Sequence, residues 1–251
     1  MGKVVFDRPI AHRGLHDIAA GIIENSRSAF EAAIEGGFAI ECDVQLSSDG
    51  EPYIFHDDDL ARLTHGTGPS SAIRIADVTS LPLKGSSSGD CPQRLSEFLA
   101  QIAGRTMLQI ELKKQVDTSA ATTLSNAVAD ALRGYDGPYT LESFDPRLLI
   151  ALRRAGVTAP LGIVTYAYDE PKWDQDVGYI QREILRHLLH WPGTRFDFIS
   201  CRDRSLRWPA VRLFRSLGLP VTAWTIRSAK QAAAALVHSD QIVFEGYLPG
   251  E

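Results

Sequence analysis

The sequence predicts an α/β fold, a TIM-type (β/α)8 barrel, and three observations lead to this prediction. Short apolar segments alternate with helix-like ones, which is typical of a parallel sheet wrapped by helices. Eight such segments are spread along 251 residues, enough chain for a large domain with a substantial core. Charged residues gather where these segments end, as they do at the catalytic face of a barrel. We therefore expect residues 1–251 to form a single barrel domain.

The strand candidates are apolar runs bounded by turn residues. They are residues 8–12, 38–46, 106–112, 139–144, 160–165, 196–200, 220–226 and 241–245. A ninth segment, residues 52–56, follows Asp49-Gly50, a strong signal for a two-residue hairpin turn. That turn makes the ninth segment an antiparallel return arm and not a barrel strand. Paired residue numbers would then sum to 99, which predicts that His56 lies opposite Asp43.

Capping residues and glycines mark several helices between these strands. An N-cap side chain accepts a hydrogen bond from the first turn, and glycine suits the residue after the last turn. By these signals we expect helices from Asn25 to Gly36, from Asp145 to Gly156, from Ser205 to Gly218 and from Ser228 to Val237.

Two segments do not fit the alternation of strands and helices. Residues 60–95 are polar and glycine-rich, a small insertion after the hairpin, and residues 165–180 mix aromatic with acidic side chains. Insertions that follow barrel strands lie on the catalytic face. We interpret both as rims or lids of a site, and an ordinary surface loop stays open for each.

Composition excludes several functional classes. The formal net charge is −5 and the 26 Lys and Arg residues are scattered, which argues against nucleic-acid binding. Three cysteines without paired spacing indicate reduced thiols. The N-terminus has no apolar run typical of a signal peptide, and no stretch approaches the roughly 20 apolar residues of a membrane span. We expect a cytoplasmic protein with no membrane span, and a homodimer is left open.

Acidic residues near the ends of the second and third strands predict a metal site. Glu41 and Asp43 share one face of their strand because side chains alternate, and Glu111 faces inward from the next strand. Hard cations such as Mg²⁺ and Ca²⁺ prefer carboxylate oxygens. Three carboxylates in a barrel interior would repel one another unless a cation neutralised them. These residues therefore predict one divalent cation, Mg²⁺ or Ca²⁺.

Two histidines and two cationic side chains are expected at the same end of the barrel. His12 and Arg13 follow the first strand, Lys113 follows the third, and the hairpin delivers His56. A phosphodiester would complete the metal coordination, with Arg13 donating two hydrogen bonds and Lys113 a point charge. Two imidazoles suit general acid–base catalysis near neutral pH. The alternative for Lys113 is the Schiff-base lysine of a barrel aldolase.

Several short motifs match one known family together. They are "HRG" (12–14), "EN" (24–25), "AF" (29–30), "ECDV" (41–44), "DG" (49–50), "HDDDL" (56–60), "IELK" (110–113), "SF" (143–144) and "AWT" (223–225). With these residues the sequence resembles the glycerophosphodiester phosphodiesterase family over nearly the whole chain. The block from 12 to 64 is the most specific, because its spacing and its chemistry match together.

The resemblance implies a barrel hydrolase that converts a small-molecule glycerophosphodiester into glycerol 3-phosphate and an alcohol, through a cyclic phosphate formed by the glycerol 2-hydroxyl. It also assigns the site residues. By motif match, His12 and His56 are the catalytic pair, Glu41, Asp43 and Glu111 bind the metal, Arg13 and Lys113 contact the phosphate, and Trp224 lines the glycerol pocket.

Two other functions stay open. A phospholipase D-like diesterase acting on lysophospholipids would need an apolar groove, which neither polar insertion indicates. A non-catalytic phosphodiester-binding barrel would not need His12 and His56.

Four further residues can be interpreted from the sequence. We interpret Asp57 as a helix cap in preference to a partner of His56. Glu24 suits a helix start or supports the metal ligands. Glu245 stands where the family often has a shorter aspartate, and His16 is interpreted as a surface residue.

Overall fold

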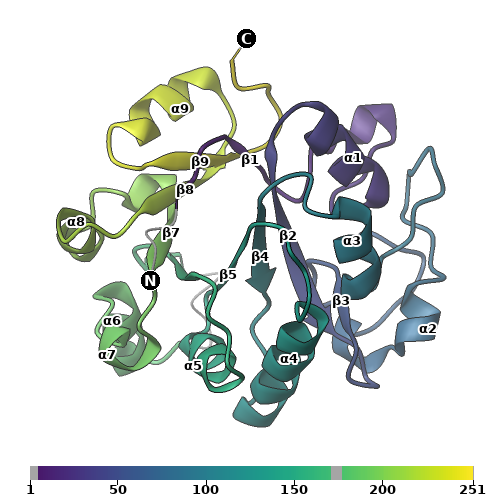
Figure 1. The fold of residues 1–251 in the computed structure, drawn as a ribbon, viewed down its shortest axis with the longest axis horizontal. Helices are drawn as coiled ribbons and strands as arrows, with labels where there is room; N and C mark the ends of the chain where they lie inside the picture. The colour runs from purple at the N-terminus through teal and green to yellow at the C-terminus, as the bar shows by residue number, and fades with distance from the viewer. Residues whose placement is uncertain (1–4, 171–176, 251) are drawn as a thin grey trace.

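The computed structural model describes residues 5–170 and 177–250, and its parallel strands form a closed barrel (Figure 1). The barrel strands are β1 (Ile10–Ala11), β2 (Ala39–Leu46), β4 (Leu108–Leu112), β5 (Tyr139–Ser143), β6 (Leu161–Thr165), β7 (Phe198–Arg202), β8 (Val221–Ile226) and β9 (Gln241–Phe244). β1 pairs with both β2 and β9, which closes the sheet. The antiparallel β3 (Pro52–Ile54) pairs only with β2 among the named strands. The predicted (β/α)8 barrel is confirmed.

Helices surround these strands, as Figure 1 shows. They are α1 (Arg27–Glu35), α2 (Ile75–Val78), α3 (Leu95–Ile102), α4 (Thr118–Ala131), α5 (Pro146–Arg154), α6 (Tyr179–Arg186), α7 (Trp191–Thr194), α8 (Pro209–Ser216) and α9 (Ala229–Leu236). Short 3₁₀ turns occupy η1 (Ile18–Ala20), η2 (Ser70–Ala72) and η3 (Asp203–Ser205). The main apolar core lies between the strands and the helices, where outward-facing strand residues such as Cys42, Ile110 and Leu141 are buried. In the part of the chain described, no helix is both long and apolar enough to cross a membrane.

Two of the four predicted helix starts are confirmed. Ser228 and Asp145 each accept a hydrogen bond from a first-turn N–H of α9 and α5. The N-cap of α1 is Ser26 and not Asn25, since the Asn25 amide is engaged elsewhere, in the site. The predicted helix after Ser205 begins only at Pro209, because Ser205 ends the separate turn η3.

The hairpin between β2 and β3 has a different register from the one predicted. Val44 pairs with Ile54, so paired residue numbers sum to 98 and not to 99. The connection is a three-residue loop that ends at Gly50, whose φ of +85° is left-handed, as such loops require. The N–H of Phe55 donates to the carbonyl of Asp43 at 3.0 Å. Phe55 therefore lies opposite Asp43, and His56 follows one residue later.

Residues 60–95, for which we left a rim and a surface loop open, contribute only Arg62 to a smaller pocket beside His56 and Lys113. They pack against β3 around a separate apolar cluster. Its buried members are Ile23, Tyr53, Phe55, Leu60, Leu63, Ile75, Val78 and Leu83. None of residues 60–95 lines the large cavity at the barrel mouth. The insertion instead supports the outer side of the hairpin that carries His56.

Residues 165–180 do contribute to the rim in their described part. Tyr166, Tyr168 and Val177 line the cavity. Residues 171–176 of the predicted rim, Trp173 among them, lie outside the described residues.

Apolar side chains fill the amino-terminal end of the barrel interior. These are Phe6, Ile10, Ala39, Phe198 and Val243. Gly162 leaves room for the ring of Phe198, because a Cβ at that position would lie 2.2 Å from Phe198 Cζ. The packed end gives the barrel a floor, so the polar residues gather at the opposite, carboxyl-terminal end.

Candidate active site

A cavity of about 880 Å³ opens at the carboxyl ends of the barrel strands. It is lined by seven of the eight predicted site residues: His12, Arg13, Glu41, His56, Glu111, Lys113 and Trp224. The eighth, Asp43, is 1% exposed and lies beside Glu111, its register partner on β4. The structure thus brings together the residues that the sequence placed at one mouth, and both histidines line the same cavity.

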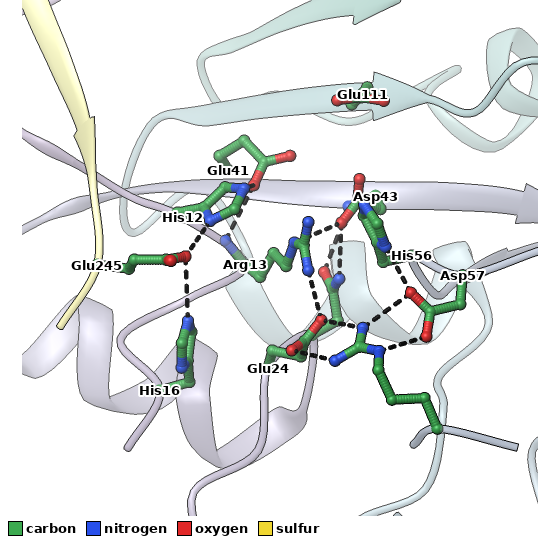
Figure 2. A network of polar contacts seen from close by, with 12 residues as sticks. His12, Arg13, His16, Glu24, Glu41, Asp43, His56, Asp57, Glu111 and Glu245 are labelled. Carbon is green, nitrogen blue, oxygen red and sulfur yellow. Dashed lines mark hydrogen bonds and ion pairs between the residues drawn. The ribbon is translucent and has the colours of Figure 1, made fainter. Parts of the chain in front are cut away.

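Three carboxylates meet at the base of this cavity. Glu41 and Asp43 come from β2 and Glu111 from β4, and each offers an oxygen within 4.8 Å of the other two (Figure 2). All three lie on inward-facing positions, because residues two apart on a strand share a face. An all-oxygen donor set of this kind is what Mg²⁺ or Ca²⁺ prefers. The residues present therefore fit a divalent cation.

Burial and mutual repulsion shape the ionisation of this cluster. Burial raises the pKa of Glu41 well above its usual value, and the charges of Asp43 and Glu111 raise it further. Burial would also raise the pKa of Asp43, but the positive charges of Lys113, His56 and Arg13 outweigh it and lower the pKa. Glu41 is thus the carboxylate whose charge most needs a further cation.

Lys113 lies against two of these carboxylates. Its Nζ atom is 2.9 Å from Glu111 Oε1 and 3.2 Å from Asp43 Oδ1. Burial would lower the pKa of Lys113, but the two carboxylates outweigh burial and raise it above the usual value. The amine therefore stays protonated, which argues against the Schiff-base alternative, since that reaction needs a neutral amine.

Asn25 holds Asp43 in place. Its Nδ2 donates to Asp43 Oδ2 at 2.9 Å, and its Oδ1 accepts from the Asp43 main-chain N–H at 3.3 Å. The residue has a φ of +54°, a conformation that asparagine tolerates better than most residues. Sequence reasoning took Asn25 for a helix cap, and the only other signal was its place in the "EN" motif.

His12 is oriented by an acid from the last strand. Its Nδ1 contacts Oε2 of Glu245, and its Nε2 is 4.0 Å from Glu41 Oε2. Burial lowers the pKa of His12, and Glu245 offsets only part of that effect. His16 is not the unpartnered surface residue we expected, because its Nε2 lies 3.7 Å from the same oxygen of Glu245. Arg227 Nη2 contacts the other oxygen at 2.5 Å.

His56 has a matching partner in Asp57. The His56 Nδ1 is 2.6 Å from Asp57 Oδ1, and Arg62 Nη2 donates to that oxygen at 2.8 Å. The interpretation of Asp57 as a helix cap was therefore wrong. With Nδ1 of each imidazole engaged by a carboxylate, Nε2 is the atom left for proton exchange with a substrate.

Glu24 connects the two halves of this network (Figure 2). Its carboxylate accepts from Arg62 at 2.8 Å and from Arg13 Nη1 at 2.6 Å. Burial would raise the pKa of Glu24, but hydrogen bonds and charges from the two arginines lower it to about 2. Arg13 Nε in turn lies 3.3 Å from Asp43 Oδ2. Glu24 thus supports the acid cluster through Arg13 and His56 through Arg62.

Glu142 on β5 is a fourth acid in the cavity lining. It is 2% exposed and pairs in register with Glu111. Burial raises its pKa to about 8, with a further contribution from the charge of Glu111. Glu142 was not assigned a role from the sequence.

Fold and site together define the class of the protein, a (β/α)8-barrel hydrolase. The model of the glycerophosphoryl diester phosphodiesterase family matches residues 12–241. The chain therefore belongs to this family of phosphoric diester hydrolases.

Curated relatives agree with this assignment. The Bacillus subtilis protein YhdW is 25% identical over 232 residues, which cover 89% of this chain and 88% of that one. The glycerophosphodiester phosphodiesterase of Caldanaerobacter subterraneus is 43% identical over 60 residues, 24% of each chain. The human glycerophosphodiester phosphodiesterase 1 is 40% identical over 72 residues, 28% of this chain and 19% of that one.

Solved structures share the fold. A phosphodiesterase of Oleispira antarctica, in complex with the product sn-glycerol-3-phosphate, superposes with a TM-score of 0.77 at 23% identity, covering 97% of this chain and 94% of that one. A glycerophosphodiester phosphodiesterase of Thermotoga maritima gives a TM-score of 0.67 at 21% identity, covering 97% and 96%.

Proposed function

We propose that this protein hydrolyses a glycerophosphodiester to glycerol 3-phosphate and an alcohol, using one divalent cation and two histidines. The observation that carries the proposal is the meeting of three buried carboxylates within 4.8 Å in a cavity lined by His12 and His56. Family membership supports the substrate class, and the relative from Oleispira antarctica binds the corresponding product.

Glu41, Asp43 and Glu111 would hold the cation, Mg²⁺ or Ca²⁺. When bound, such an ion supplies positive charge that stabilises the phosphate in the transition state. Their oxygens are close enough to share one ion. Burial, and after it the charges of Asp43 and Glu111, raise the pKa of Glu41, and the positive charge of an ion would oppose both effects.

Arg13 and Lys113 would bind the phosphate. Both line the cavity, and both are held by carboxylates that fix their positions. The guanidinium carries five donors, so its contacts with Glu24 and Asp43 leave donors for a phosphate oxygen. The ring of Trp224 packs edge-on against the ring of Phe144, with the ring centroids 5.6 Å apart. It would offer an apolar surface for the glycerol carbons.

His12 and His56 would move the protons. One imidazole takes the proton of the attacking glycerol 2-hydroxyl, and the other donates a proton to the departing alkoxide. The products of this step are a cyclic glycerol phosphate and the free alcohol, and water then opens the ring. Glu245 and Asp57 would stabilise whichever imidazole becomes positively charged.

Hydrolysis of glycerophosphocholine, followed by ³¹P NMR of quenched samples, tests this proposal. We expect cyclic glycerol phosphate before glycerol 3-phosphate in the wild type, and loss of turnover in His12→Ala and His56→Ala. His65→Ala, an exposed histidine outside the cavity lining, is the matched control. Unchanged turnover in His56→Ala would remove that residue from the mechanism, and ¹⁸O incorporation in the first step would indicate direct attack by water.

A single barrel domain, a cytoplasmic location and a homodimer stay predictions. Cell fractionation would check the location, and light scattering would check the oligomeric state.

A further inference from the structure

One acid in the cavity lining has no part in the proposed mechanism. Glu142, on β5, is 2% exposed and pairs in register with Glu111. Among the described residues, only Glu41, Asp43 and Glu111 bring possible metal-ligand atoms close enough together to share one ion. Glu142 lies outside that group. Because an unpaired polar group is costly to bury, this carboxylate needs a partner other than the ion.

Only one oxygen of the Glu142 carboxylate has a hydrogen-bond partner. Its Oε1 atom accepts a hydrogen bond from Ser200 Oγ at 3.4 Å. No group in the described part of the chain forms a hydrogen bond with the other oxygen, Oε2. Burial raises the pKa of Glu142 and the nearby amide of Gln109 opposes this effect, but both polar atoms of that amide also lack a hydrogen-bond partner among the described residues. A buried oxygen in this position favours a ligand that offers it a hydrogen bond.

Glu142 lies between the acid cluster and the proposed glycerol site. On one side it pairs with Glu111 of β4, and on the other its carboxylate reaches Ser200 of β7. Phe144, two residues after Glu142, also lines the cavity, and its ring centroid lies 5.6 Å from that of Trp224 on β8. A substrate with its phosphate at the acid cluster and its glycerol at Trp224 would therefore extend past Glu142.

We propose that Glu142 binds the primary hydroxyl of the glycerol, the hydroxyl that is neither esterified nor attacks phosphorus. This inference rests on the proposed function, which places the 2-hydroxyl at a histidine and leaves the primary hydroxyl for another partner. A hydroxyl both donates and accepts hydrogen bonds, so it can pair with Oε2 of Glu142 whether the carboxyl is ionised or protonated. Glu142 is then a residue that selects for a glycerol with its primary hydroxyl free.

The test compares glycerophosphocholine with its 1-deoxy analogue, 2-hydroxypropyl phosphocholine. The analogue keeps the attacking 2-hydroxyl and lacks only the primary hydroxyl. We expect the wild-type kcat/KM to be at least about tenfold higher for glycerophosphocholine. The reason is that a site that forms a hydrogen bond with a substrate hydroxyl rejects an analogue without it, since the buried group is then left unpaired.

Variants of Glu142 assign this preference to its carboxyl group. In Glu142→Leu, which removes both oxygens at similar volume, the preference for glycerophosphocholine should fall to about twofold or less. Glu142→Gln still offers hydrogen-bonding atoms to a hydroxyl and should keep most of the preference. Glu35→Leu, the same substitution at an exposed acid outside the cavity lining, is the control and should keep the wild-type preference.

The outcomes separate this inference from the proposed function. If the wild type hydrolyses neither substrate, the proposed function fails. If it hydrolyses both equally well, the inference fails and the proposed function stands, and this comparison does not depend on the folding of any variant. An unchanged preference in Glu142→Leu, with kcat/KM lowered equally for both substrates, would also contradict the inference, because Glu142 would then support the metal site or the fold and not the hydroxyl.

Discussion

The imidazole of His12, after β1, contacts the carboxylate of Glu245, after β9, although 233 residues separate them. The pairing of β1 with β9 that closes the barrel brings the two residues together. His56 has the equivalent partner in Asp57, its neighbour in sequence. Arg227 contacts the carboxylate of Glu245, and Arg62 contacts that of Asp57. Each imidazole is therefore held by a carboxylate that is paired with an arginine, although different parts of the fold provide the two pairs.

Replacing Glu245 with Gln should lower kcat by about 10- to 100-fold, because the imidazole loses the charge that orients it and stabilises its protonated form. KM should change little, since Glu245 faces His12 and not the phosphate-binding residues. Steady-state kinetics on glycerophosphocholine measures both values. Glu35→Gln, at an exposed acid outside the cavity lining, is the control. A wild-type kcat in Glu245→Gln would show that His12 needs no such partner.

Arg62→Lys should lower kcat several-fold. The guanidinium donates to Asp57 and to both oxygens of Glu24, and an ammonium cannot reproduce this fork. Arg74 is exposed and lies outside the cavity lining, so Arg74→Lys should leave kcat unchanged. Equal kcat values for Arg62→Lys and Arg74→Lys would mean that Arg62 does not position His56.

Glu24 should make stability depend on pH in the acid range. Its pKa is about 2 in the folded state, against 4.5 for an unperturbed carboxyl. A lowered pKa stabilises the folded state above the unfolded value, and this contribution is lost as pH falls from about 4.5 towards 2. The loss should be of order 3 kcal/mol at most. Urea unfolding at pH 7 and near pH 3 measures it.

Glu24→Gln removes this titration, so the stability gap between wild type and variant should narrow as pH falls. A gap that stays constant from pH 7 to pH 3 would contradict the account of Glu24.

Replacing Asn25 should lower the free energy of unfolding. Asn25→Ala loses two hydrogen bonds to Asp43 and places alanine at a left-handed φ, which together should cost about 3 kcal/mol. Asn25→Gly tolerates the backbone and loses only the hydrogen bonds, so it should be about 1 kcal/mol more stable than Asn25→Ala. Chemical denaturation ranks the three proteins. An alanine variant more stable than the glycine variant would contradict the backbone argument.

The barrel and most of its site were predictable because their signals are local. Each strand is an apolar run between turn residues, and Glu41, Asp43 and Glu111 take inward positions by simple alternation. The hairpin register was not predictable in this way. Asp49 Oδ1 accepts hydrogen bonds from Ser47 and from the N–H of Ile75, 26 residues later, so a distant segment helps to select the three-residue loop.

The residues that orient the histidines escaped prediction for a similar reason. Glu245 meets His12 only once the barrel closes, and Glu24 meets Arg62 across 38 residues. The sequence also did not indicate the apolar cluster of Tyr166, which follows β6, and Leu185, on α6, because only the fold brings the two side chains together.

The position of the metal ion tests the central claim most directly. Crystals soaked in Mn²⁺, under conditions where Mn²⁺ restores turnover to EDTA-treated protein, would locate the ion by anomalous scattering. We expect one strong peak within coordination distance of Glu41, Asp43 and Glu111, and its loss in Glu111→Gln. A peak away from these three carboxylates, or full turnover after EDTA treatment with no ion added, would contradict the account.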